Sequence, residues 1–154
     1  MRKMMKMNLL PSILFMMFFS FIIQYYIMSI IMTNDITNIR NSLGKLYISM
    51  IMAFLMGIVE VMMHDFYAGV LSLQYYIPLF VILGTFYYLY KKQYKINDKE
   101  YLNEMIEHHS MALLTSDEIL KKTSDDNMIL LADSIIKGQQ KEISIMKQMV
   151  QNMS

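Results

Sequence analysis

The sequence predicts an all-α membrane protein in which three transmembrane helices precede an antiparallel hairpin of two further helices. Hydrophobic residues make up 55% of the 154 positions, which exceeds their share in an ordinary soluble domain. Most of them lie in the first ninety residues, where only five charged side chains occur between Met7 and Lys91. The rest of the chain is polar, with apolar residues at the spacing of amphipathic helices.

The first apolar segment runs from Leu9 to Met32 and contains no charged residue. Its 24 residues are enough to cross a bilayer core of about 30 Å. Three basic residues precede it, as they would in a signal peptide. However, the apolar run is longer than a signal-peptide core, and no cleavage site of small residues follows it. We therefore expect an uncleaved membrane anchor.

A polar loop, Thr33 to Lys45, separates this anchor from the second apolar segment, Leu46 to Met63. Small residues recur every fourth position within that segment, at Ser49, Ala53 and Gly57. Such a stripe allows the backbones of membrane helices to approach closely. We therefore expect the second segment to be a span that packs tightly against its neighbours.

The third apolar segment, Leu73 to Tyr90, carries tyrosines at both ends, which is typical of aromatic side chains at membrane interfaces. Four lysines follow it and the chain then stays polar: Lys91, Lys92, Lys95 and Lys99. The change in composition predicts a domain boundary close to residue 95. We expect a membrane domain over residues 1–95, with spans near 9–32, 46–63 and 73–90, and a helical hairpin domain over residues 96–154.

The polar domain has the signals of two helices. Asn97, with Glu100 three residues later, resembles a capping box and predicts a helix over residues 98–122. The polar stretch 121–127 supplies a turn, and a second helix is expected to run to about Gln151.

Both hairpin helices carry polar residues in the middle of an apolar stripe. His108 and His109 lie in the first stripe, and Gln139 and Glu142 lie in the second. Antiparallel pairing about the turn places Gln139 opposite His108, and Glu142 opposite Met105. Since buried polar groups must bond to one another or bind a ligand, the two helices are expected to share one polar cluster.

Imidazole and thioether groups suit copper, whereas a carboxylate also tolerates Cu(II), zinc or iron. The predicted copper ligands are His108, His109, Met105, Glu142 and Met146. Gln139 is expected to orient an imidazole rather than to bind the ion. The alternative is a metal-free assembly module, in which the same histidine, glutamine and glutamate side chains form a hydrogen-bonded network that sets helix register.

At these residues the chain resembles a known family, the domain of unknown function 305. The resemblance covers about residues 101–149 and rests on the motifs MIEHHSMAL and LADSIIKGQQKEISIM. It implies a ferritin-like helical hairpin and, because some relatives are periplasmic copper-binding proteins, a copper-binding function. A membrane-anchored subgroup has three spans before a hairpin that lies outside the cytoplasm. The family commonly has proline where this chain has Glu107.

Two helices alone bury little apolar surface, so we expect the hairpin to form a four-helix bundle as a homodimer. The expected partners are therefore the lipid bilayer and a second copy, since no basic stripe indicates nucleic acid. The sequence shows no nucleophile paired with a base and no phosphate-binding loop, so it gives no indication of an enzyme. The total count of basic residues favours a cytoplasmic hairpin, whereas the basic residues before the first span favour an extracytoplasmic one. Because the first span often dominates insertion, we expect the hairpin to be extracytoplasmic.

Overall fold

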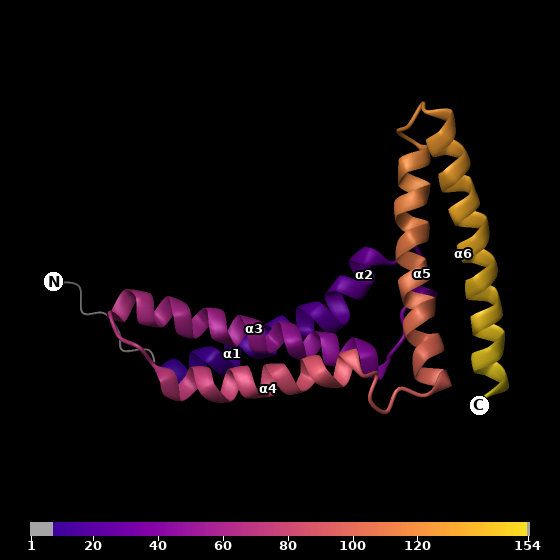
Figure 1. Cartoon of the computed structure of the whole chain (residues 1–154). Coiled ribbons are helices and arrows are strands. Elements are labelled where there is room, and N and C mark those ends of the chain that lie inside the picture. Colours follow the sequence, from indigo (N-terminus) through magenta and orange to yellow (C-terminus); the bar gives the residue numbers. More distant parts are fainter. Residues whose placement is uncertain (1–7, 154) are drawn as a thin grey trace. The chain divides into compact units, whose positions relative to one another are not determined.

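A computed structural model describes residues 8–153, and within this range all regular secondary structure is helical, with no strands (Figure 1). The prediction of an all-α protein is therefore confirmed. The chain divides into two compact units. The first contains the residues up to 25 together with 46–94, and the second contains residues 26–45 together with 95–154. We call these the apolar unit and the hairpin unit.

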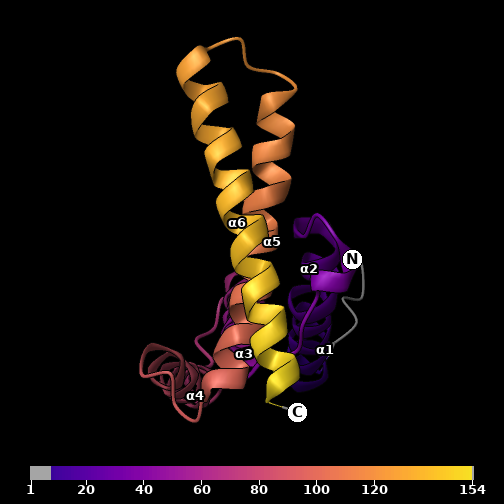
Figure 2. The same cartoon turned by 90° about the vertical axis from the view of Figure 1, so that its right-hand side faces the viewer.

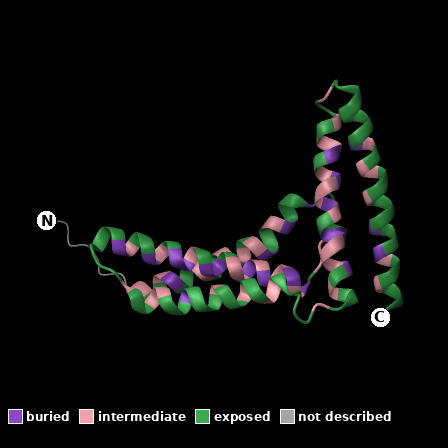
Figure 3. Ribbon diagram, in the orientation of Figure 1, coloured by how far each residue is buried: buried purple, intermediate pink, exposed green. Residues whose placement is uncertain are grey.

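Three helices form the apolar unit: α1 (Leu9–Ile22), the greater part of α3 (Leu43–Ala68), and α4 (Leu73–Lys91). Their shared core consists of Ile13, Phe54, Ile58, Val61 and Leu79. Many large apolar residues of the same helices are exposed, and exposed positions occur along all three helices in Figure 3. Apolar side chains therefore lie on both the inside and the outside of this unit.

The stripe of small residues on α3 lies inside this unit. Ser49, Ala53 and Gly57 are all buried. A Cβ atom added at Gly57 would lie 2.9 Å from Cγ of Met17 on α1 and 3.4 Å from Cδ2 of Leu79 on α4. The stripe therefore allows α3 to approach both neighbouring helices, as small residues do in membrane helix packing.

Two helical segments are long and apolar enough to cross a membrane, Leu9–Met32 with 24 residues and Leu43–Ala68 with 26 residues. The first of them is α1 followed by a π-helical turn, η1 (Ile23–Ile27), and by α2 (Met28–Met32). The third predicted span forms the helix α4, but its mean hydropathy is too low for it to count as a candidate membrane span. Its tyrosine, glutamine and proline side chains lower its hydropathy, so two helices rather than three have the composition of a span.

The hairpin unit contains two long antiparallel helices, α5 (Asp98–Leu120) and α6 (Asp126–Asn152), which lie side by side in both views (Figures 1 and 2). The predicted cap is confirmed, because the Asn97 side chain accepts a hydrogen bond from the Glu100 backbone N–H at 3.0 Å. The Asp125 side chain caps α6 in the same way, accepting from two backbone N–H groups. Between the helices lies a core of Leu102, Ile106, Leu113, Ile143 and Met146.

Residues 26–45 belong to the same compact unit as the hairpin. Within this segment, α2 and the 3-10 turn η2 (Ile36–Asn38) both contact α5. The helix α5 is therefore covered on two sides, by α6 and by the end of the first apolar segment together with the loop that follows it. The sequence placed residues 33–45 in a loop of the membrane domain, because contacts between distant segments leave no local signal.

Candidate metal site in the helical hairpin

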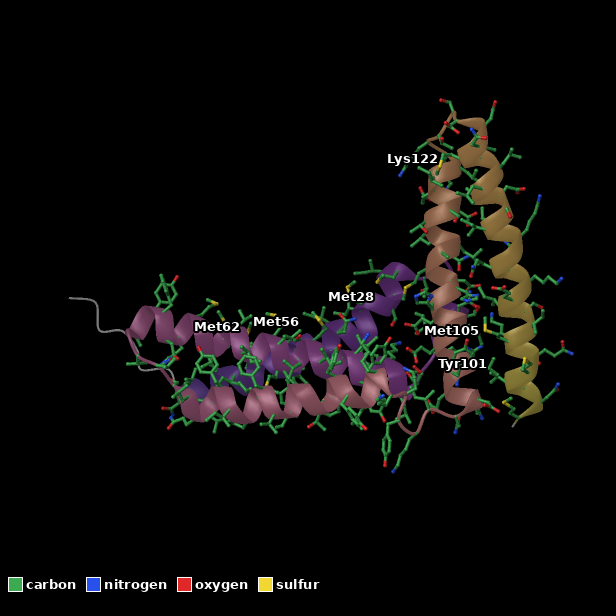
Figure 4. All side chains as sticks on the ribbon, in the orientation of Figure 1. Met28, Met56, Met62, Tyr101, Met105 and Lys122 are labelled. Carbon is green, nitrogen blue, oxygen red and sulfur yellow. The ribbon has the colours of Figure 1, made fainter. Side chains whose placement is uncertain are left out.

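A cavity of about 280 Å³, widely open to solvent, lies between α5 and α6 in the half of the hairpin nearest the start of α5. Its lining residues are Tyr101, Met105, His109, Glu142, Ile145 and Met146. Figure 4 labels Tyr101 and Met105, which come from successive turns of α5. Four of the six predicted site residues therefore line one cavity: Met105, His109, Glu142 and Met146.

The closest polar contact in the cavity joins Nδ1 of His109 to Oε2 of Glu142, at 3.1 Å. The two atoms are within ion-pair distance, yet their geometry does not make a hydrogen bond, and His109 Nδ1 is buried without one. The Oε1 atom of Gln139 is likewise buried and without a hydrogen-bond partner. Buried polar atoms are normally satisfied, and of these two residues only His109 lines the cavity, so its imidazole nitrogen is the atom that a ligand in the cavity could bind.

The pairing across the hairpin differs from the sequence prediction by about one helical turn. The count that placed Gln139 opposite His108 also places Gly138 opposite His109, whereas the structure places Glu142 beside His109. Side chains on a helix lean toward its N-terminus, and the two helices are antiparallel. His109 therefore leans toward higher-numbered residues of α6, while Glu142 leans back toward the turn, and the two side chains meet.

His108 does not line the cavity. Its side chain is exposed, and its ring centroid lies 6.5 Å from that of His109. Adjacent residues on a helix point about 100° apart, so one helix directs only one of the two imidazoles inward. His108 follows Tyr101 by seven residues and lies two turns further along the same face of α5.

Comparison with known sequences extends beyond the hairpin. Residues 88–150 match the domain of unknown function DUF305. An uncharacterized protein of Acanthamoeba polyphaga mimivirus is 34% identical over 134 residues, which is 87% of this chain and 88% of that protein. The chain belongs to the DUF305 family. The similarity to the viral protein is longer than the DUF305 segment, so it also includes apolar segments. No solved structure matches the chain.

The DUF305 hairpin offers a mixed set of donors to an ion: one imidazole, one carboxylate and two thioethers. Within residues 8–153, no three histidine, aspartate or glutamate side chains form a group that could hold a metal. A zinc or di-iron site normally needs more such ligands. Thioethers with an imidazole fit Cu(I), and methionine side chains are flexible enough to close on an ion in this cavity.

Several residues of the DUF305 hairpin escaped the sequence prediction. Tyr101 and Ile145 line the cavity, although neither was assigned a role in the site. Glu107 faces away from α6 and bonds to residues 26–45. Burial raises the pKa of Glu104 above its usual range, and the charges of Glu100 and Glu107 act in the same direction. The sequence did mark Glu107 as unusual, because the family commonly has proline at this position beside the histidines. The partners of Glu107 could be found only from the fold.

Proposed function

We propose that this DUF305 protein is a membrane-anchored copper-binding protein that holds the ion in its hairpin. The observation that supports this proposal is the cavity in which Met105, His109, Glu142 and Met146 meet. The buried imidazole nitrogen of His109, which has no hydrogen bond, would be the first ligand. The two thioethers favour Cu(I), while the carboxylate supplies a harder ligand that Cu(II) accepts.

Titration of the full-length protein in detergent with Cu(I) and with Cu(II) tests the proposal. Replacing both histidines, His108→Ala with His109→Ala, should weaken binding by about 100-fold, because loss of an imidazole removes a principal ligand. His108→Ala alone should have a much smaller effect than His109→Ala alone, since only His109 lines the cavity. Unchanged affinity in the double variant would rule out the site.

The metal-free alternative also has an observation in its favour, the 3.1 Å contact between His109 and Glu142. In an assembly module this contact would set the register of the two helices. The same titration separates the two proposals, because a metal-free module binds neither form of copper. Its hairpin would still lose stability when His109 is replaced.

We further propose that α4 crosses the membrane as a third span, although its composition is less apolar than that of the other two helices. The support comes from the hairpin unit, in which Asn34 and Arg40, in the loop between the first two segments, donate backbone hydrogen bonds to side chains of α5. Segments in contact must lie on the same side of a membrane. If only the first two segments crossed, the loop between them and the hairpin would lie on opposite sides. A crossing by α4 returns the chain to the side of that loop.

Single-cysteine labelling tests this arrangement, because the chain contains no cysteine of its own. Three exposed positions serve: Ile36 between the first two segments, Leu71 between α3 and α4, and Ser124 in the hairpin turn. In sealed vesicles, an impermeant maleimide should label Ile36→Cys and Ser124→Cys from one side and Leu71→Cys from the other. Labelling of Leu71→Cys and Ser124→Cys from the same side would contradict a third span. Vesicles of known orientation also test the proposed extracytoplasmic position of the hairpin.

The hairpin also has the surface expected of a homodimer. Much of α6 is exposed in Figure 3, and large apolar side chains lie on it: Leu130, Leu131, Ile145 and Met149. A second hairpin that packs against these residues would form a four-helix bundle and remove apolar surface from water. Tyr101 and His108 are exposed on a neighbouring face of α5, so a partner hairpin there would bring His108 into the interface.

A further inference from the structure

On one face of α5, the carboxylate of Glu107 is in contact with three hydrogen-bond donors. Glu107 accepts hydrogen bonds from Oγ of Ser29 at 2.6 Å and from the backbone N–H of Arg40 at 2.9 Å. It also pairs with Nζ of Lys45 at 3.0 Å. The two charged side chains are nearly enclosed, with 9% of Glu107 and 12% of Lys45 exposed. All three donors come from residues 29–45, which we call the docked segment.

Two more residues of α5 bind the docked segment. Oγ of Ser110 donates to Oδ1 of Asn34 at 2.6 Å and accepts from the Asn34 backbone N–H at 3.3 Å. Glu100 accepts a hydrogen bond from the backbone N–H of Leu43. Three backbone N–H groups of the docked segment, those of Asn34, Arg40 and Leu43, therefore donate to side chains of α5.

The contacts of the docked segment with α5 are mainly polar. Of its large apolar side chains, Ile39 and Leu43 are partly buried, whereas the others are exposed: Ile30, Ile31, Met32 and Ile36. Release of the segment therefore exposes little apolar surface. For this reason the free energy of such a local opening is smaller than that of global unfolding. In contrast, the core between α5 and α6 is apolar and does not include the docked segment.

We infer that Glu107 is a latch, which holds the docked segment on α5 and whose loss frees the segment while the hairpin stays folded. Glu107 is the centre of the contact because it alone combines a hydroxyl, a backbone N–H and an ammonium group from three different positions. A nearly buried charge requires its partners, so the carboxylate fixes one position of the segment. The hairpin unit thus has two states, with the docked segment either bound to α5 or released from it.

Hydrogen–deuterium exchange of the full-length protein in detergent, without added metal, tests the latch. In Glu107→Ala, peptides that cover residues 33–45 should exchange about tenfold faster or more, because three of their N–H groups lose protection. Lys45→Met, which keeps most of the side-chain volume and removes the charge, should act in the same direction. Peptides from the α5–α6 core should exchange as in the wild type.

Glu118→Ala is the matched control, because Glu118 pairs only with exposed Lys121 on the same helix. It should leave exchange in residues 33–45 unchanged. The inference is overturned if neither Glu107→Ala nor Lys45→Met accelerates exchange in that segment. It is equally overturned if both variants accelerate the α5–α6 core to the same extent, since the segment would then not open separately.

Discussion

Replacing Met105 and Met146 together by leucine should weaken Cu(I) binding by about 100-fold and change Cu(II) binding by less than about tenfold. Both thioethers line the cavity, whereas His109 and Glu142 supply its nitrogen and oxygen donors. Cu(I) prefers soft sulfur ligands, while imidazole and carboxylate also serve Cu(II). Leucine and methionine have similar volumes, so the variant should keep the hairpin core, to which Met146 belongs.

Competition titrations with a Cu(I) chelator and a Cu(II) chelator measure the two affinities. Met149→Leu with Met153→Leu is the matched control, because these two exposed methionines of the same region do not line the cavity. If the control weakens Cu(I) binding as much as the test variant does, copper binds to methionines in general and not to this cavity. Equal losses for Cu(I) and Cu(II) would contradict the assignment of the thioethers to Cu(I).

Replacing Gly57 by leucine should lower the stability of the apolar unit by about 2 to 3 kcal/mol, the size expected for overpacking in a tight core. Even a Cβ at this position would meet Met17 at 2.9 Å, and a leucine side chain is far larger. Either α1 or α4 must then move away from α3. The loss should appear as a lower melting temperature, followed by circular dichroism in detergent.

Gly84→Leu is the control for this substitution, since a Cβ at Gly84 meets no atom within 4 Å. It replaces glycine by a better helix former and should keep or raise the melting temperature. Gly57→Ala should have an intermediate effect, because the flexible Met17 side chain can move slightly. A melting temperature for Gly57→Leu that equals the wild-type value would show that the close approach does not stabilise the unit.

The hairpin shows how far local patterns predict structure. The cap at Asn97, the start of α5 at Asp98 and the polar turn follow from hydrogen-bonding preferences that act over three or four residues. Such preferences belong to the sequence itself, so they were correctly predicted. The convergence of Met105, His109, Glu142 and Met146 also follows from helical spacing.

The sequence did not determine which of the two histidines lines the cavity. His109 enters the cavity and His108 stays outside, because the direction of each imidazole depends on how α5 is rotated against α6. The partner of His109 also differed from the count made about the turn, since side chains in antiparallel helices lean in opposite directions. A sequence pattern defines which residues share a face of a helix, but it does not define which residue of the neighbouring helix packs against that face.

The sequence by itself determined the helical class and four of the six residues that line the candidate site, because these depend on composition and short-range periodicity. Its motifs also indicated the family of the hairpin. Only the tertiary structure decided that residues 29–45 dock on α5 through Glu107 and Ser110. Those contacts join residues more than sixty positions apart, and their donors include backbone N–H groups that every residue except proline carries. No local pattern distinguishes such donors, so the contacts of the Glu107 face of α5 could be identified only from the folded chain.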